Sequence, residues 1–272
     1  MWIPVTPGEE IFLLLYAQGK DISVQSQTNG LYDSLVAPDR FSQFTRIVAA
    51  LEITIRTLSA GTALTRSAPD ATPNDYRTAI DRNGIELPAP VQSDRSFWES
   101  VKLASENILN EPALRDSLEQ LKQPTFRNGR KSCYLCGKRF QSGVGANQYL
   151  KKSVDHLWPL CLGGSNALDN LVPACVGCNN TRNEAVTWAW GPVQSTRLKK
   201  STSKEPDKDL KLSLGFARMM LYAERFNGNL TLKATLQKMF PACIDLSPAQ
   251  NKHESYFEIF KRMEDDVWQL RH

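Results

Sequence analysis

Two Cys-x-x-Cys pairs constrain this 272-residue chain more than any other feature of its sequence. The first pair is Cys133 and Cys136, and the second is Cys175 and Cys178. Four thiolates delivered as two such pairs are typical of a tetrahedral zinc site, which leaves no coordination position open. We therefore expect a structural zinc ion whose removal would unfold the segment that it holds.

The segment between the two cysteine pairs has the pattern of a hairpin followed by a helix. Residues 153–157 are typical of a short strand, Gly163 and Gly164 permit a sharp reversal, and residues 170–172 are typical of a returning strand. Residues 175–189 then favour a helix. With one cysteine pair ahead of the hairpin and the other at the start of the helix, a single zinc ion can clamp the whole unit.

Positive charge is concentrated on the same segment. Residues 123–183 carry eight Lys and Arg against two Asp and Glu, a net charge of +6. Residues 1–122 carry 11 against 16, a net charge of −5, and residues 184–272 carry 14 against 11, a net charge of +3. Cations placed near phosphates release condensed counterions, so this excess favours a nucleic-acid surface. A solvated basic surface without a partner is the alternative.

The regions on either side carry the apolar spacing of amphipathic helices. In the N-terminal region this spacing predicts helices near residues 7–19, 41–60, 96–109 and 112–122, and turn-rich connections at 67–74 and 81–90. Thr6 and Glu9 form a capping box ahead of the first helix, which favours a helix over a secretion signal for the apolar residues that follow. The polar, basic stretch 124–132 marks the expected boundary of the N-terminal region.

The resulting fold class is mainly α with an embedded small α+β unit. The expected divisions are a helical region at 1–122, the cysteine-bearing unit at 123–190, a basic linker at 191–210 and a helical region at 211–272. Within the last region, helical spacing is found near residues 211–226, 231–239 and 247–270. No apolar run approaches the roughly 20 residues of a membrane span, so we expect no membrane partner and a cytoplasmic location.

The cysteine-bearing segment resembles the HNH endonuclease family, also called the ββα-metal nucleases. The resemblance spans about fifty residues and rests on the order and spacing of Cys133-x-x-Cys136, Asp155-His156, Pro159, Gly163-Gly164, Asn170-Leu171, Cys175-x-x-Cys178-Asn179 and Arg182. It implies a zinc-stabilised nuclease core flanked by helical regions. It also implies a metal-dependent endonuclease that hydrolyses nucleic-acid phosphodiester bonds, with DNA preferred over RNA.

Phosphodiester hydrolysis gives roles to three of these residues, in agreement with the family resemblance. His156 is the candidate general base, because imidazole titrates near neutral pH and can take a proton from the attacking water. Asp155 and Asn179 supply oxygen ligands for a catalytic divalent cation, for which this donor set favours Mg²⁺ or Mn²⁺. The adjacent Asn180 is an alternative to Asn179.

Other residues are expected to support the site. The resemblance implies that Asn170 ties down the loop between the strands and so orients the histidine, and we count it with the catalytic residues. The expected contacts to nucleic acid are Arg182, Lys151, Lys152, Lys138 and Arg139.

Two further hypotheses concern a different class of function and the setting of the protein. The unit could instead be a non-catalytic zinc-bound module that docks nucleic acid or protein. The acidic region 1–122 could cover the basic site or bind a regulatory partner. Similar HNH proteins act in bacterial antiviral defence beside an ATPase, so we expect such a partner, and no nucleotide-binding glycine loop is visible in this chain.

Overall fold

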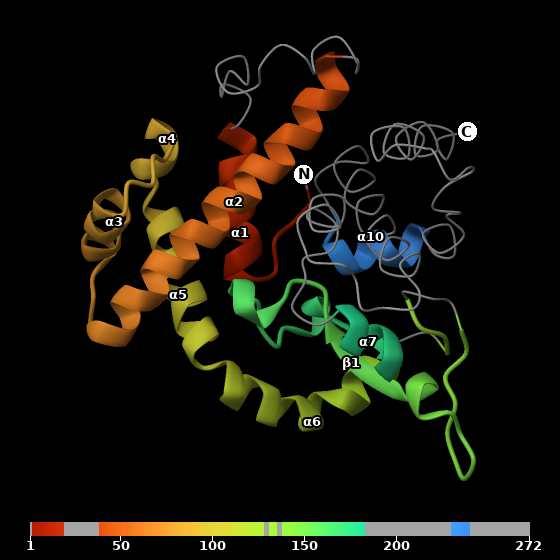
Figure 1. Ribbon diagram of the computed structural model, residues 1–272. Coiled ribbons are helices and arrows are strands. Elements are labelled where there is room, and N and C mark those ends of the chain that lie inside the picture. Colours follow the sequence, from red (N-terminus) through yellow and green to blue (C-terminus); the bar gives the residue numbers. More distant parts are fainter. Residues whose placement is uncertain (1, 19–37, 128–130, 135–137, 183–229, 240–272) are drawn as a thin grey trace, which may run out of the picture. The chain divides into compact units, whose positions relative to one another are not determined.

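The computed structural model describes residues 2–18, 38–127, 131–134, 138–182 and 230–239 (Figure 1). This part of the chain is mostly helical and contains one two-stranded antiparallel sheet. The expected fold class, mainly α with an embedded small α+β unit, is confirmed. Within the described residues, no helix combines the length and the apolar character needed to cross a membrane.

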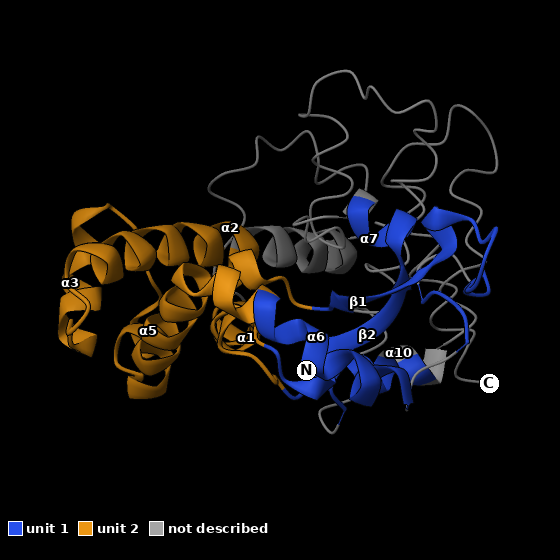
Figure 2. Ribbon diagram, turned by 90° about the horizontal axis from the view of Figure 1, so that it is seen from below, with its two compact units in different colours: residues 1–3, 116–157, 166–272 blue, residues 4–115, 158–165 orange. Residues whose placement is uncertain are grey.

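The chain divides into two compact units (Figure 2). The first, which we call the helical unit, comprises residues 4–115 and 158–165. The second, which we call the hairpin unit, comprises residues 1–3, 116–157 and 166–272. Residues 158–165 therefore belong with the N-terminal helices, although they connect the two strands of the hairpin unit.

The helical unit begins with the predicted capping box. Helix α1 (Pro7–Gln18) is opened by Thr6, whose Oγ1 accepts a hydrogen bond from the Glu9 backbone N–H at 3.3 Å. The Glu9 carboxylate accepts in return from the backbone N–H groups of Thr6 and Val5, at 3.0 and 3.1 Å. Thr6 and Glu9 are both buried, so the helix N-terminus is satisfied without water.

Three helices form the core of the helical unit. Helix α2 (Pro38–Ser67) and helix α5 (Arg95–Leu109) pack against each other and against α1. Their interface buries large apolar side chains, among them Phe12, Leu51, Leu58, Phe97 and Val101. The predicted helices at 41–60 and 96–109 are confirmed, and α2 extends to Ser67. Gly61 lets α2 approach α5 closely. A Cβ at Gly61 would lie 2.5 Å from Ser105 Oγ.

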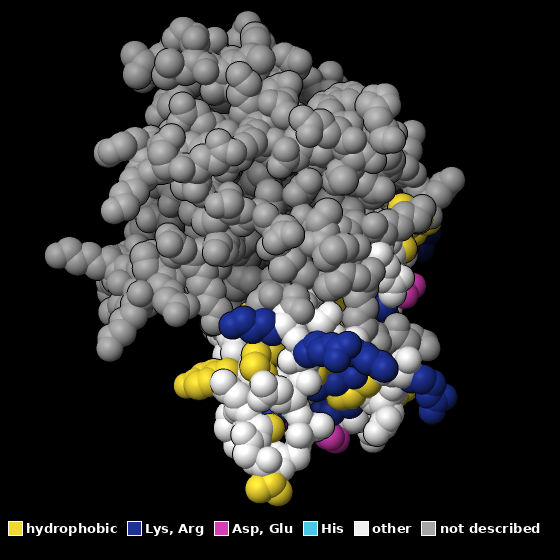
Figure 3. All heavy atoms as spheres, turned by 90° about the vertical axis from the view of Figure 1, so that its right-hand side faces the viewer, with side chains coloured by type: hydrophobic (Ala, Val, Ile, Leu, Met, Phe, Trp, Pro, Cys, Tyr) yellow, Lys and Arg dark blue, Asp and Glu magenta, His cyan; other side chains and the backbone are white. Residues whose placement is uncertain are grey.

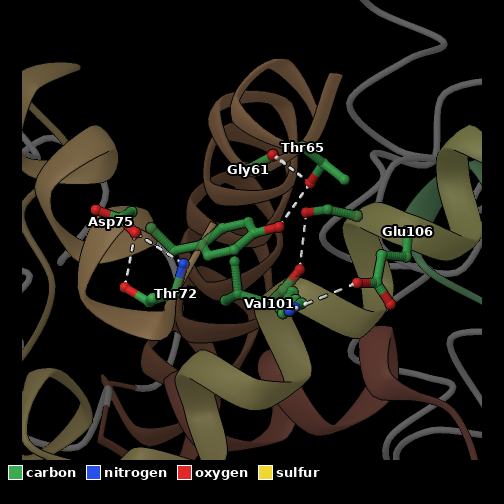
Figure 4. A network of polar contacts seen from close by, with 9 residues as sticks. Gly61, Thr65, Thr72, Asp75, Val101 and Glu106 are labelled. Atoms are coloured by element: carbon green, nitrogen blue, oxygen red, sulfur yellow. Dashed lines mark hydrogen bonds and ion pairs between the residues drawn. The ribbon is translucent and has the colours of Figure 1, made fainter. Parts of the chain in front are cut away.

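Helix α3 (Pro73–Arg82) lies between the two segments expected as connections and was not predicted. A capping box again opens it, because Asp75 accepts from the Thr72 backbone N–H at 2.8 Å and from its hydroxyl at 2.7 Å. The Tyr76 ring is buried and its hydroxyl lies 2.7 Å from Thr65 Oγ1 of α2 (Figure 4). Burial raises the pKa of Tyr76. The short helix α4 (Ala89–Gln92) follows.

Helix α6 (Glu111–Arg127) runs past its predicted end at residue 122 and into the stretch expected as a boundary. Pro124 lies inside the helix and removes one backbone donor. The last turn is nevertheless held by tertiary contacts, since Thr125 is buried and the Phe126 ring lies 4.3 Å from the Lys152 ammonium. These contacts outweigh the local helix-breaking signal.

Residues 158–165 are anchored in the core of the helical unit. Trp158 is fully buried, with its ring centroid 5.6 Å from that of Phe12, and its indole N–H donates to the Leu162 carbonyl at 2.8 Å. Leu162 ends a single 3-10 turn, η3 (Leu160–Leu162).

The expected reversal at Gly163 and Gly164 is also present in this segment. Gly163 adopts φ +74°, a left-handed conformation that favours glycine. Its carbonyl accepts from the Gly8 backbone N–H at 3.1 Å, and a Cβ at Gly8 would lie 1.9 Å from Leu162 O. Asn107 of α5 donates to the Gly164 carbonyl at 3.0 Å. The absence of side chains at these glycines thus allows the segment to reach the helices.

The hairpin unit contains the predicted strands. Strand β1 (Lys152–His156) pairs antiparallel with β2 (Leu171–Cys175), with Lys152 opposite Cys175 and His156 opposite Leu171. Helix α7 (Val176–Arg182) starts directly after β2, so Cys175 ends a strand and does not begin the helix as expected. Two single turns of 3-10 helix, η2 (Gln148–Leu150) and η4 (Leu168–Asn170), precede β1 and β2 respectively.

The C-terminal part is described only in one helix. Helix α10 (Leu232–Met239) confirms the helix predicted at 231–239. The expected basic linker at 191–210 and the helices expected at 211–226 and 247–270 lie outside the described residues.

Candidate functional site

Three cysteines of the hairpin unit come together as a buried cluster. The sulfur atoms of Cys133, Cys175 and Cys178 all lie within 4.8 Å of one another, and no disulfide joins them. Tetrahedral zinc with bonds of about 2.3 Å places its sulfur ligands about 3.8 Å apart, so this spacing fits the ion. Cys136, the fourth expected ligand, lies outside the described residues.

The backbone around the cluster folds as the ligand pairs require. The Cys133 N–H donates to the Lys138 carbonyl at 2.9 Å. The Cys178 N–H points to Cys175 Sγ at 3.4 Å, and such donors stabilise a thiolate. A further cysteine, Cys161, is half-buried in the helical unit and does not belong to the cluster.

Asp155 is a buried residue of β1, and its carboxylate contacts Tyr134, the residue after Cys133. Its Oδ2 accepts a hydrogen bond of 2.6 Å from the Tyr134 hydroxyl. Tyr134 directly follows Cys133, so the loop that carries the first zinc ligand also fixes this carboxylate. The contact links the loop that carries Cys133 of the cysteine cluster to Asp155.

His156 ends β1 and lies almost entirely inside the protein. Its Nε2 is 2.8 Å from Asn166 Oδ1, and Asn166 Nδ2 donates to Ser117 Oγ of α6 at 2.9 Å. These two contacts link the imidazole of His156 through the Asn166 amide to α6 and fix the orientation of the ring.

Asn179 of α7 is tied to the strand that carries Asp155. Its Nδ2 donates to the Val154 carbonyl at 3.0 Å and to Ser153 Oγ at 3.3 Å. Among the described residues nothing donates to Asn179 Oδ1, which leaves this oxygen available as a ligand. The neighbouring Asn180 is exposed.

Asn170 is buried just before β2 and contacts the residue that follows His156. Its side chain is fully buried, and its backbone carbonyl accepts from the Leu157 N–H at 2.8 Å, directly after His156. Its own backbone N–H donates to the Ala167 carbonyl at 2.8 Å. Asn170 therefore connects the returning strand to the residue that follows the histidine.

The basic residues differ in their surroundings. Lys138 and Arg139 are exposed, and Lys151 is partly exposed. The Lys152 ammonium instead lies over the rings of Phe126 and Phe140, 4.3 and 5.4 Å from their centroids, and burial lowers the pKa of Lys152. Arg182 ends α7, and its side chain lies outside the described part of the structure.

The sequence motifs did not point to Tyr134, Asn166 or Ser117. Tyr134 and Asp155 are 21 residues apart, and Asn166 and Ser117 are 49 apart. No local periodicity connects such pairs. The available signal was a polar amide shortly after the two glycines, in a stretch that otherwise consists of turn and apolar residues.

Comparison with known protein families identifies the same region of the chain. Residues 133–189 match the HNH endonuclease family. No curated protein and no solved structure matches the chain. The HNH resemblance seen in the motifs is therefore confirmed for residues 133–189, and members of this family act on nucleic acid with the help of divalent metal ions.

Proposed function

We propose that this protein is a metal-dependent endonuclease that cuts DNA in preference to RNA, with its reaction centred on Asp155, His156 and Asn179. The observation that carries the proposal is the hydrogen bond from Asn179 Nδ2 to the Val154 carbonyl. This bond holds an amide oxygen beside the strand on which Asp155 and His156 follow one another. A module that only binds nucleic acid has no need of a carboxylate, an imidazole and a carboxamide at these places.

His156 acts as the general base. Its imidazole removes a proton from the attacking water while the water oxygen forms a bond to phosphorus and the bond from phosphorus to the leaving 3′ oxygen breaks. Asn166 acts as a positioning residue, because its Oδ1 lies 2.8 Å from His156 Nε2 and fixes the orientation of the imidazole. Ser117 and Asn170 keep the two ends of this arrangement in place.

Asp155 and Asn179 hold the divalent cation through oxygen atoms. The Asn179 amide oxygen, which has no donor among the described residues, fits this role better than the exposed Asn180. Oxygen donors of this kind suit Mg²⁺ or Mn²⁺. When bound, such a cation polarises the phosphate and stabilises the charge that develops on the leaving oxygen.

The proposal is tested by cleavage of supercoiled plasmid in the presence of Mg²⁺ or Mn²⁺. We expect His156→Ala to lower the rate by about 10²- to 10⁴-fold, the usual contribution of a general base, while zinc content and circular dichroism stay unchanged. His253→Ala, which removes a histidine outside residues 133–189, is the matched control and should cut normally. Undiminished cutting by His156→Ala would remove the assigned mechanism.

The same preparation distinguishes the non-catalytic alternative. One tightly held zinc ion, no Mn²⁺ binding that depends on Asp155, and no cleavage of plasmid, single strands or RNA would indicate a docking module. A role in antiviral defence and an ATPase partner stay predictions from the family resemblance.

A further inference from the structure

The loop between the first cysteine pair and β1 presents an exposed aromatic side chain on a strongly cationic surface. Residues 123–154 contain seven Lys and Arg and no Asp or Glu. Lys131, Lys138 and Arg139 are exposed, and we call them the basic patch. Figure 3 shows Lys and Arg side chains gathered on the described part of one face, with apolar side chains beside them.

Tyr149 is the aromatic residue of this surface. It lies in η2, with 71% of its surface exposed. Its backbone and Cβ are nevertheless packed tightly on α7, since a Cβ at Gly177 would lie 3.2 Å from both Tyr149 Cβ and Tyr149 O. The ring is thus presented to solvent from a fixed base beside the helix that carries Asn179.

Hydrogen bonds keep the loop in shape and connect Tyr149 to the basic patch. The Gln141 N–H donates to the Leu150 carbonyl at 3.0 Å, and the Asn147 N–H donates to the Gln141 side chain at 2.9 Å. Asn147 Oδ1 in turn accepts from the Tyr149 N–H at 2.9 Å. Gln141 follows Arg139 by two residues, so Lys138, Arg139 and Tyr149 belong to one hydrogen-bonded loop. Lys131 lies beside this loop, because its carbonyl accepts from the Phe140 N–H at 3.2 Å.

We infer that Tyr149 and the basic patch bind a single-stranded stretch of the nucleic-acid substrate, with the ring stacked on an unpaired base. The excess of cations identifies a polyanion as the occupant. An exposed aromatic face among these cations is the usual platform for a base, and a base can stack on it only where it is not already stacked within a duplex. The inference rests on the proposed function and adds to it the class of substrate, DNA with an unpaired segment.

The test measures binding, so that it is independent of cutting. In the full-length His156→Ala background, fluorescence anisotropy gives the Kd for a short single-stranded DNA oligonucleotide and for the same sequence as a blunt duplex. We expect Tyr149→Ala to weaken single-strand binding by about 5- to 150-fold, the usual loss for one stacked base, and duplex binding much less. Tyr149→Phe and Tyr149→Trp should bind nearly as well as the parent, because they keep the ring.

Charge and stacking are separated by salt. Lys138→Ala and Arg139→Ala should each reduce the slope of log affinity against log salt by about 0.7 for single strands, whereas Tyr149→Ala should leave the slope unchanged. Leu103→Ala is the matched control, because Leu103 is an exposed apolar side chain of α5 in the helical unit, and it should change nothing. Tyr149→Ala keeps the Cβ that packs near Gly177, and zinc content checks that its fold is intact.

Specific results would overturn the inference. Parental single-strand affinity in Tyr149→Ala, an equal loss on the duplex, or a Tyr149→Phe variant as weak as Tyr149→Ala would each contradict stacking. Plasmid cleavage that survives His156→Ala would contradict the proposed mechanism but would leave this binding result standing, so the two failures can be told apart.

Discussion

Different interactions stabilise the interiors of the two units of the molecule. The helical unit buries large apolar side chains such as Phe12, Phe97 and Trp158 between long helices. The hairpin unit has a two-stranded sheet, a cluster of three thiols and buried polar residues, among them Asp155, His156 and Asn170. A sheet of two strands is marginal by itself, so we expect a metal ion held by these thiols to add to the stability of the hairpin unit.

This difference explains where the candidate site lies. Buried polar side chains are costly unless each is hydrogen-bonded, and the hairpin unit meets this condition with fixed partners such as Tyr134 and Asn166. A polar interior of this kind can hold a carboxylate and an imidazole in defined orientations. The described residues of the helical unit contain no group of three or more potential metal ligands.

The largest expected effect is the loss of the structural metal. Cys175→Ser, or removal of zinc by a chelator, should unfold the hairpin unit, because the apparent zinc-binding free energy at such sites is about 10 kcal/mol or more. Hydrogen exchange should show loss of protection in β1 and β2 and retained protection in α5. Cys161→Ser, which lies outside the cluster, is the control. If both units lost protection together, the two would not be held independently.

The second-largest expected effect is a loss of stability in the helical unit. Trp158→Ala should lower the free energy of unfolding by about 3 to 5 kcal/mol, because it leaves a cavity beside Phe12. Urea unfolding followed by circular dichroism measures this loss, and Leu103→Ala on the exposed face of α5 should change it little. A loss confined to β1 and β2 would mean that the ring belongs to the hairpin unit.

A smaller effect tests the polar network around the histidine. Asn166→Ala should lower kcat by about 10- to 100-fold with little change in KM, because it releases the imidazole without touching substrate. Asn166→Asp keeps an acceptor oxygen for Nε2 and should recover part of the loss. Equal kcat values for the two variants, or a change in KM alone, would contradict a positioning role for Asn166.

The smallest effect concerns acid stability in the helical unit. Hydrogen bonds from Thr72 lower the pKa of Asp75 below its ordinary value of 3.8. A carboxyl with a depressed folded pKa stabilises the protein above the unfolded pKa and loses this contribution as pH falls through the folded pKa. In the Asp75→Asn variant, the urea midpoint of unfolding should therefore decrease less steeply as the pH falls below about 4. Asp70→Asn, a neighbouring exposed carboxyl, serves as the control, and an equal flattening there would contradict the assignment.

Short-range patterns predicted the hairpin unit well. The strands predicted at 153–157 and 170–172 overlap β1 and β2, and three of the four cysteines expected as ligands lie together. Turn glycines and Cys-x-x-Cys spacing, which pointed to these features, are local signals. Helix α3 was missed because Pro73, Asn74 and Asp75 resemble a turn. Its helical form depends on the Thr72 cap and on burial of Tyr76 against α2, which is a tertiary contact.

The candidate site shows the same limit. Asp155, His156 and Asn179 could be named because phosphodiester chemistry restricts the residue types that serve as base and ligands. Tyr134 and Asn166 could not, because their roles come from partners that the fold brings together over 21 and 10 residues of sequence. Spacing alone contains no sign of either contact.

The placement of residues 158–165 in the helical unit limits which fragment of the chain can be studied alone. The chain leaves the hairpin unit after Leu157 and re-enters it at Asn166, so His156 and Asn166, which lie in hydrogen-bond contact, are separated in sequence by a segment that packs in the helical core. A fragment cut at the edges of residues 133–189 would keep this segment but lose Phe12 and Gly8, against which Trp158 and Gly163 pack.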